Sequence, residues 1–148
     1  MTGPSLDPRW PDGSRHPAPL SGEAHVWRAH LEAPGWPDES GLPGGERERA
    51  RAMHSRGAGR RWAASRWALR EVLARYLGVD PTTIQLCTSE RGKPRLAAPT
   101  PLAFNLSHSG PLALVAVTAG RQVGVDIECI APGRDFVALA MRELDPGD

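Results

Sequence analysis

Two short motifs bring together residue types that can bind a metal ion and phosphate groups. Residues 104–109 read FNLSHS and offer amide, hydroxyl and imidazole groups, and residues 124–128 read GVDIE and offer two carboxylates. Side chains alternate faces along a strand, so Asp126 and Glu128 should share one face. Neighbouring carboxylates repel unless a cation lies between them, and Mg²⁺ commonly takes one or two carboxylates with water and phosphate oxygens. The pair suggests a Mg²⁺ site. The spacing alone favours the alternative, two solvated acids at a strand end.

A third element is the tripeptide Gly92-Lys93-Pro94. Lys93 is the only lysine among the 18 lysine and arginine residues of the chain. Glycine and proline on either side predict a tight turn. Lysine binds phosphate as a point charge, so the turn is a candidate phosphate contact. A solvated turn lysine explains the residue equally well.

The apolar runs around these motifs predict an antiparallel meander of three strands with short connections. The expected strands are residues 102–106, 112–118 and 122–127. Alternation places Phe104 and Leu106 on one face of the first strand and Asn105 and Ser107 on the other. Taken by itself, His108 is best explained as a histidine in a turn whose hydrogen bonds are satisfied.

The strongest helix signal covers residues 60–77, where apolar residues recur at helical spacing and Gly78 follows as a natural C-cap. Residues 46–54 predict a short charged helix that is interrupted near Gly57 and Gly59. A shorter strand is expected at residues 84–88. The fold class is therefore α+β, an antiparallel sheet packed against a long helix. The tryptophans Trp62 and Trp67 could stack on nucleobases, although their spacing is better explained by core packing.

Charge is unevenly distributed, although the whole chain has a net charge of only +1. Residues 47–75 hold nine arginines and two glutamates, which gives +7, and residues 121–148 hold three arginines and six acids, which gives −3. A basic helical region beside an acidic end favours a polyanionic ligand with a metal ion. Nucleic-acid binding through residues 47–75 is a competing interpretation.

The length of 148 residues fits one domain. Residues 1–23 are rich in Pro, Gly and Ser and are expected to be disordered, which leaves residues 24–148 as the folded part. Cys87 and Cys129 are isolated and are expected to be reduced thiols. No secretory signal is visible, and no run reaches the ~20 apolar residues that a membrane span needs. The expected location is cytoplasmic, with no membrane partner.

In this order and spacing, the three motifs resemble those of the 4′-phosphopantetheinyl transferase superfamily, in its Sfp-type branch. The resemblance covers about residues 24–145. It implies a transferase that moves the phosphopantetheine arm of coenzyme A to a serine of an acyl or peptidyl carrier protein. The family needs Mg²⁺ and releases adenosine 3′,5′-bisphosphate (3′,5′-ADP). Its fold is a pseudo-dimer of two similar halves, with coenzyme A bound between them.

The resemblance also implies roles for individual residues. Asp126 and Glu128 would hold Mg²⁺ against the pyrophosphate of coenzyme A and form the catalytic centre. Lys93 would meet the 3′-phosphate. The other implied contacts to coenzyme A are Arg49, Arg56, Gly92, Pro94, Ser107 and His108.

One departure concerns the family motif W-x-x-K-E-A, whose Glu is a metal ligand or base and whose Lys contacts coenzyme A. This motif does not follow GVDIE here, where residues 136–144 predict only a helix. The expectation is that the chain corresponds to the first half of the pseudo-dimer and needs a second half, or self-association, for activity. The alternative is a catalytically inactive half that binds coenzyme A or a partner. Nucleic-acid binding ranks below both.

Overall fold

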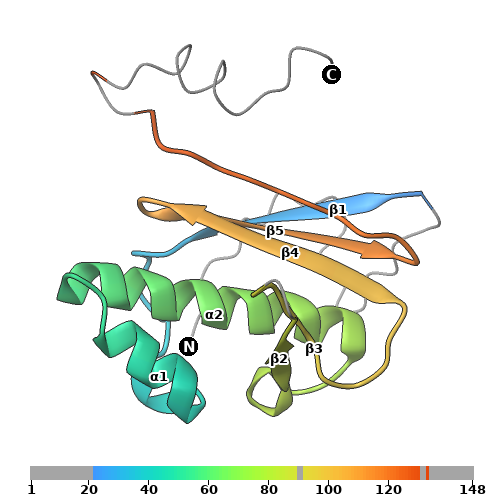
Figure 1. Cartoon of the computed structure of the whole chain (residues 1–148), viewed down its shortest axis with the longest axis horizontal. Coiled ribbons are helices and arrows are strands. Elements are labelled where there is room, and N and C mark those ends of the chain that lie inside the picture. Colours follow the sequence, from blue (N-terminus) through green and yellow to red (C-terminus); the bar gives the residue numbers. More distant parts are fainter. Residues whose placement is uncertain (1–21, 90–91, 131–132, 134–148) are drawn as a thin grey trace.

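The protein is an α+β fold in which one long helix crosses one face of an antiparallel sheet (Figure 1). The computed structural model describes residues 22–89, 92–130 and 133. The sheet is formed by β1 (Ala24–His30), β4 (Leu102–Ser109) and β5 (Leu112–Ala119). These strands lie in the order β1-β5-β4, and both neighbouring pairs are antiparallel. The long helix is α2 (Arg56–Leu77), so the expected fold class is confirmed.

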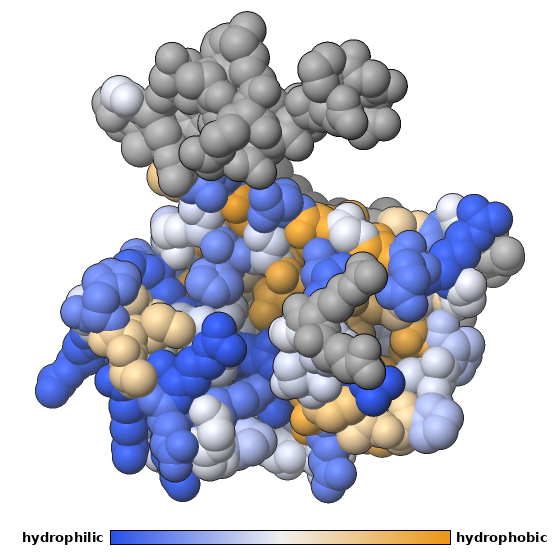
Figure 2. All heavy atoms as spheres, in the orientation of Figure 1, coloured by the Kyte–Doolittle hydropathy of each residue, from blue (hydrophilic) through white to orange (hydrophobic). Residues whose placement is uncertain are grey.

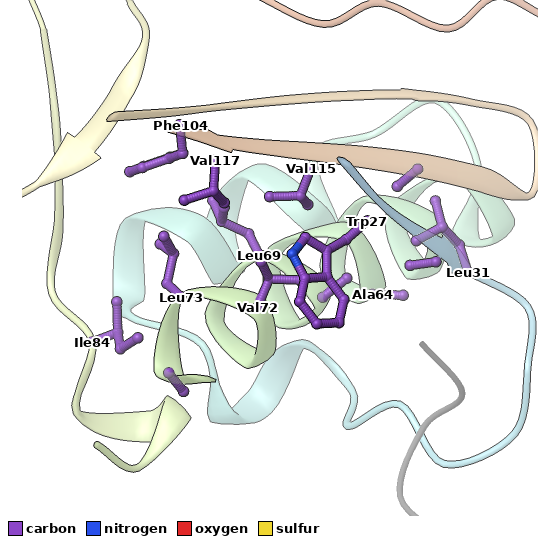
Figure 3. Packing of buried hydrophobic residues seen from close by; sticks show 14 residues of the cluster. Trp27, Leu31, Ala64, Leu69, Val72, Leu73, Ile84, Phe104, Val115 and Val117 are labelled. Carbon is purple, nitrogen blue, oxygen red and sulfur yellow. The ribbon is translucent and has the colours of Figure 1, made fainter. Parts of the chain in front are cut away.

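The core lies between α2 and the sheet (Figure 3). The central strand β5 is the most buried because it is paired on both sides, and Val115 and Val117 are almost inaccessible to solvent. Trp27 lies opposite Val115 in the register, and Phe104 lies opposite Val117. Alternate residues of each strand therefore meet the apolar side of α2. The same alternation turns the intervening residues of β4 toward the opposite face.

Helix α2 begins four residues earlier than its periodicity predicts. Ser55 is the N-cap, and its hydroxyl accepts a hydrogen bond from the Ala58 amide at 3.2 Å. At the other end Gly78 adopts a left-handed conformation with φ of 68°, as expected for a C-cap glycine. The predicted break between two helices is present, but it lies at residues 52–55 rather than at the two glycines, because Gly57 and Gly59 both lie inside α2.

Gly59 is required for the contact between α2 and the preceding helix, α1 (Gly44–Arg51). A Cβ at Gly59 would lie 2.4 Å from the backbone oxygen of Ala50, a distance that no side chain tolerates. The two helices therefore touch through backbone atoms. This contact holds the cations of α1 beside those of α2.

The remaining elements are short. They are two 3₁₀ turns, η1 (Glu39–Gly41) and η2 (Pro81–Thr83), and an antiparallel hairpin of β2 (Leu86–Thr88) and β3 (Pro94–Leu96). The predicted strand at residues 84–88 is confirmed in its second part only. Within the described residues, no helix is long and apolar enough to cross a membrane.

The predicted meander is wrong in one strand. Residues 122–127 form no strand, and the third strand of the sheet is β1. Figure 1 shows the segment after β5 crossing the sheet on the face opposite α2. The helix expected at residues 136–144 lies outside the described residues, as does most of the segment expected to be disordered.

Candidate functional site

A cleft of about 520 Å³ lies where α1, α2, the β2–β3 hairpin and β4 meet. Four of the candidate coenzyme A contacts line it: Arg49, Gly92, Pro94 and His108. The cleft also receives side chains that the motifs did not indicate, notably Glu46, Trp62, Arg66 and Arg70. In Figure 2 strongly hydrophilic residues gather on the side of this face formed by α1.

The turn that holds Lys93 is built by local hydrogen bonds. Gly92 has φ of 78°, a conformation that favours glycine. The Ser89 amide donates to the Lys93 carbonyl at 2.8 Å, and the Lys93 amide donates to the Ser89 hydroxyl at 3.1 Å. Gly92 and Pro94 face the cleft, whereas Lys93 is exposed and does not line it. The backbone of Lys93 therefore lies beside the cleft, and its side chain is open to solvent.

In the helical wall of the cleft, two guanidinium groups lie over one aromatic ring. The guanidinium carbon of Arg49 lies 5.7 Å from the ring centre of Trp62, and that of Arg66 lies 5.6 Å from it. Both distances fit cation–π contacts. Trp67 is core, with 5% of its surface exposed, so the core interpretation is confirmed for this tryptophan. Trp62 is only half-buried and lines the cleft.

A single carboxylate, Glu46, binds two of the arginines. Its Oε1 accepts hydrogen bonds from Arg66 Nε at 2.8 Å and from Arg66 Nη2 at 2.6 Å. Its Oε2 lies 2.9 Å from Arg70 Nη2, in an ion pair rather than an aligned hydrogen bond. Arg70 is fully buried, and burial lowers the pKa of its guanidinium despite the attraction of Glu46. With Arg49, the cleft wall has three cations and one anion.

His108 is turned toward this wall. Its pKa is lowered, first because neighbouring atoms displace part of its water and then because the charges of Arg61 and Arg66 repel a proton. The side chain nevertheless keeps a large exposed surface, so its burial is partial. An anion in the cleft would reverse the repulsion and favour the protonated imidazole.

The acidic segment is attached to β4 by side chains rather than by a strand ladder. Gly120, with φ of 72°, ends β5, and the chain then crosses the sheet. The Val125 amide donates to Asn105 Oδ1 at 2.8 Å. In the same way, the Ile127 amide donates to Ser107 Oγ at 3.3 Å, and the Cys129 amide donates to Ser109 Oγ at 3.0 Å. Alternate residues of β4 thus accept hydrogen bonds from alternate backbone amides of the acidic segment, residues 124–129.

The two serines of this series also orient the two carboxylates. The Ser107 hydroxyl donates to Asp126 Oδ1 at 2.6 Å, and the Ser109 hydroxyl donates to Glu128 Oε1 at 3.4 Å. Asp126 and Glu128 are exposed and alternate with the half-buried Ile127, so the predicted alternation is present without the predicted strand.

Two exposed carboxylates are a donor set that fits Mg²⁺, which takes one or two from the protein and fills its shell with water and phosphate oxygens. Among the described residues, no group of three or more His, Cys, Asp or Glu side chains could hold a metal ion. A cation here would therefore depend on its ligand for further oxygens.

The structure separates some residues that the sequence grouped together. Ser107 and His108 are adjacent in the chain, yet Ser107 faces the acidic segment and His108 faces the cleft on the α2 side. Arg56 lines a different hollow, of about 240 Å³, with Glu39 and Arg60. The sequence motifs did not indicate Glu46. Its only signal in the sequence is that it is an acidic residue next to a basic stretch.

Residues 39–120 match the family described as 4′-phosphopantetheinyl transferase, N-terminal. The chain belongs to this family. It is 40% identical over 133 residues to the 4′-phosphopantetheinyl transferase HetI of Nostoc sp., a match that covers 86% of this chain and 56% of HetI.

Other members of the family match in the same way. The 4′-phosphopantetheinyl transferase of Bacillus subtilis is 32% identical over 101 residues, which cover 68% of this chain and 44% of the relative. AcpT of Escherichia coli K12 is 36% identical over 107 residues, which cover 72% and 50%. The chain thus spans about half the length of the curated relatives that it matches.

Proposed function

We propose that this chain provides the coenzyme A-binding part of an enzyme that transfers 4′-phosphopantetheine to a serine of an acyl or peptidyl carrier protein. The observation on which the proposal chiefly rests is the cationic cleft bounded by the Gly92 turn, His108 and the cation–π contacts of Arg49 and Arg66 with Trp62. In the reaction, the serine oxygen would form a bond to the phosphorus next to pantetheine. The pyrophosphate bond would break, and 3′,5′-ADP would leave.

The charges of the cleft favour a ligand with several phosphates. Arg49, Arg66 and Arg70 contribute three positive charges and Glu46 one negative charge, a balance of +2. Lys93 adds a further cation beside the cleft. Coenzyme A carries a 3′-phosphate and a pyrophosphate, and each can accept charge-assisted hydrogen bonds. The cleft volume of about 520 Å³ lies within the range usual for small-molecule sites.

Asp126 and Glu128 lie on the face of β4 opposite the cleft, and β4 is an edge strand of the sheet. A coenzyme A molecule in the cleft would therefore extend past this edge for its pyrophosphate to meet a metal ion held there. Bound Mg²⁺ would neutralise charge on the pyrophosphate. Asp126 and Glu128 are the residues that would hold it. Ser107 and Ser109 would orient these carboxylates, so we assign Ser107 a role through Asp126 rather than a direct contact to phosphate. Phosphoryl transfer depends mainly on positioning and charge neutralisation, which these groups can supply.

Binding of 3′,5′-ADP to the 148-residue chain, measured by isothermal titration calorimetry, tests the proposal. We expect saturable binding at one site and weaker binding of 5′-AMP, which lacks the 3′-phosphate. Lys93→Ala should weaken 3′,5′-ADP binding about tenfold, because a charge-assisted contact is lost at an exposed position. Arg95→Ala is the matched control, since Arg95 is an exposed cation two residues away that does not line the cleft. Equal affinities for 3′,5′-ADP and 5′-AMP would refute the 3′-phosphate assignment.

Transfer itself is tested separately. The chain would be incubated with coenzyme A, Mg²⁺ and an apo carrier protein, and the carrier would be weighed by mass spectrometry. A phosphopantetheine mass increase would establish the transferase activity. Binding of 3′,5′-ADP without transfer is the result expected both of a chain that needs a second half and of the non-catalytic coenzyme A-binding alternative, so only a mass increase would exclude the non-catalytic alternative.

The structure gives little support to nucleic-acid binding. Of the nine arginines in residues 47–75, four form ion pairs among the described residues: Arg51, Arg61, Arg66 and Arg70. These pairs neutralise part of the charge, and Arg66 and Arg70 line a cleft of small-molecule size rather than a surface that a phosphate backbone could follow. The remaining charge is smaller than the sequence count suggests.

A further inference from the structure

We infer that Glu46 is a positioning residue that holds the cations of the cleft in the arrangement that binds phosphate. The inference deepens the proposed function and rests on it. An anion in a site for polyanions should weaken binding by Coulomb repulsion. The geometry of Glu46 points to the opposite effect.

Both carboxylate oxygens of Glu46 face arginines, although only Oε1 accepts hydrogen bonds. Its Oε1 accepts hydrogen bonds from Nε and Nη2 of Arg66. Its Oε2 is buried and forms an ion pair with Arg70. Only 18% of the Glu46 side chain is exposed, with 11% for Arg66 and 2% for Arg70. A ligand phosphate therefore meets a carboxylate whose charge is already neutralised by two guanidinium groups.

Arg66 is held on two sides. Glu46 binds one edge of its guanidinium, and the ring of Trp62 lies against the group at 5.6 Å. These contacts leave Nη1 as the nitrogen that is not bound to Glu46. An arginine fixed in this way loses less side-chain entropy when it binds an anion. Glu46 thus prepares Arg66 for a ligand.

Glu46 also determines where Arg49 lies. The two residues are three apart on α1, so they share one face of that helix. Glu46 ties this face to α2 through Arg66 and Arg70, and the Arg49 guanidinium lies 5.7 Å from the centre of the Trp62 ring. Releasing Glu46 would loosen α1 against α2 and move Arg49 with it. One carboxylate therefore controls two cations of the cleft.

The test is Glu46→Gln, compared with Glu48→Gln. The control removes the same charge from the same helix at an exposed position that does not line the cleft. We expect Glu46→Gln to weaken 3′,5′-ADP binding about tenfold, the scale of one charge-assisted interaction, although it makes the cleft more positive. Glu48→Gln should bind like the wild type. Equal or tighter binding by Glu46→Gln would overturn the inference.

A second readout does not depend on the ligand. The Arg66 Nε–H proton should exchange slowly and give a sharp ¹H–¹⁵N signal in the wild type and in Glu48→Gln, assigned by its loss in Arg66→Lys. The signal should disappear in Glu46→Gln. If the wild type bound no 3′,5′-ADP, the proposed function would fail, and this signal would still decide whether Glu46 fixes Arg66. An unprotected Arg66 signal in the wild type would overturn the inference.

Glu46→Gln leaves the buried charge of Arg70 without its partner, which can prevent folding. The double variant Glu46→Gln/Arg70→Met removes both charges of that pair, yet Arg66 still loses its carboxylate. It should fold and show the same weaker binding and the same loss of the Arg66 signal. Wild-type affinity in the folded double variant would contradict the positioning role.

Discussion

Replacing Ser107 with alanine should detach the acidic segment from β4 at one point. The hydroxyl makes two contacts with this segment: it donates to Asp126 Oδ1 at 2.6 Å and accepts from the Ile127 amide at 3.3 Å. A bond to a charged group contributes about 1.5–3 kcal/mol and a neutral one about 0.5–1.5 kcal/mol. Because Asp126 is exposed and water can replace the hydroxyl, the lower ends apply, for a total of about 2 kcal/mol.

Amide hydrogen exchange measures this local opening. A loss of about 2 kcal/mol in local stability should speed exchange of the Ile127 amide roughly 30-fold. The Val125 amide should change less, because its own acceptor, Asn105 Oδ1 at 2.8 Å, remains in place. Ser107→Thr keeps the hydroxyl and should stay close to the wild type.

The same variant separates two roles for Ser107. If Ser107 acts through Asp126, Ser107→Ala should leave metal-free binding of 3′,5′-ADP unchanged and weaken binding of Mn²⁺ in the presence of pyrophosphate. An unchanged Ile127 exchange rate, or a loss of metal-free 3′,5′-ADP binding with unchanged Mn²⁺ affinity, would refute the reasoning.

Three further predictions follow from single sites. Gly59→Ala should lower the free energy of unfolding by about 3 kcal/mol in urea titrations, because its Cβ would meet the Ala50 backbone oxygen. Gly57→Ala, whose Cβ would have only an ordinary contact, should be neutral or stabilise by up to about 1 kcal/mol. The pKa of His108 lies below its ordinary value of 6.5, so only the unfolded chain takes up this proton as the pH falls from 6.5 toward the folded-state pKa. The free energy of unfolding should fall over this window, and His108→Gln should reduce the slope; an unchanged slope would contradict the assignment. Asp126→Asn and Glu128→Gln should each weaken Mn²⁺ binding about tenfold or more in titrations followed by electron paramagnetic resonance. Removing a metal ligand should cost at least as much affinity as removing a residue that hydrogen-bonds to the ligand. Wild-type affinity in both variants would show that the cation binds elsewhere.

The local features of the chain could be predicted from the sequence because they depend on neighbouring residues. The spacing of apolar residues predicts α2, and Gly78 predicts its end. Alternation predicts that Asn105 and Ser107 point away from Phe104, as the structure shows. The turn at Gly92 follows from its own residues as well, with the positive φ that glycine adopts readily.

Other features were decided by contacts between distant parts of the chain. The predicted meander paired residues 122–127 with one edge of β5. In the structure this edge pairs with β1, which lies about 90 residues earlier in the chain. The acidic segment is bound instead by side chains of β4, a contact that periodicity cannot reveal because both arrangements have the same alternation. Glu46 meets Arg66 across 20 residues, and only the close approach of α1 and α2 at Gly59 makes that pair possible. The sequence by itself therefore determined which groups are available for phosphate and metal. The packing of two helices and the crossing of one segment decided which of them act together, because those contacts depend on distances in space rather than along the chain.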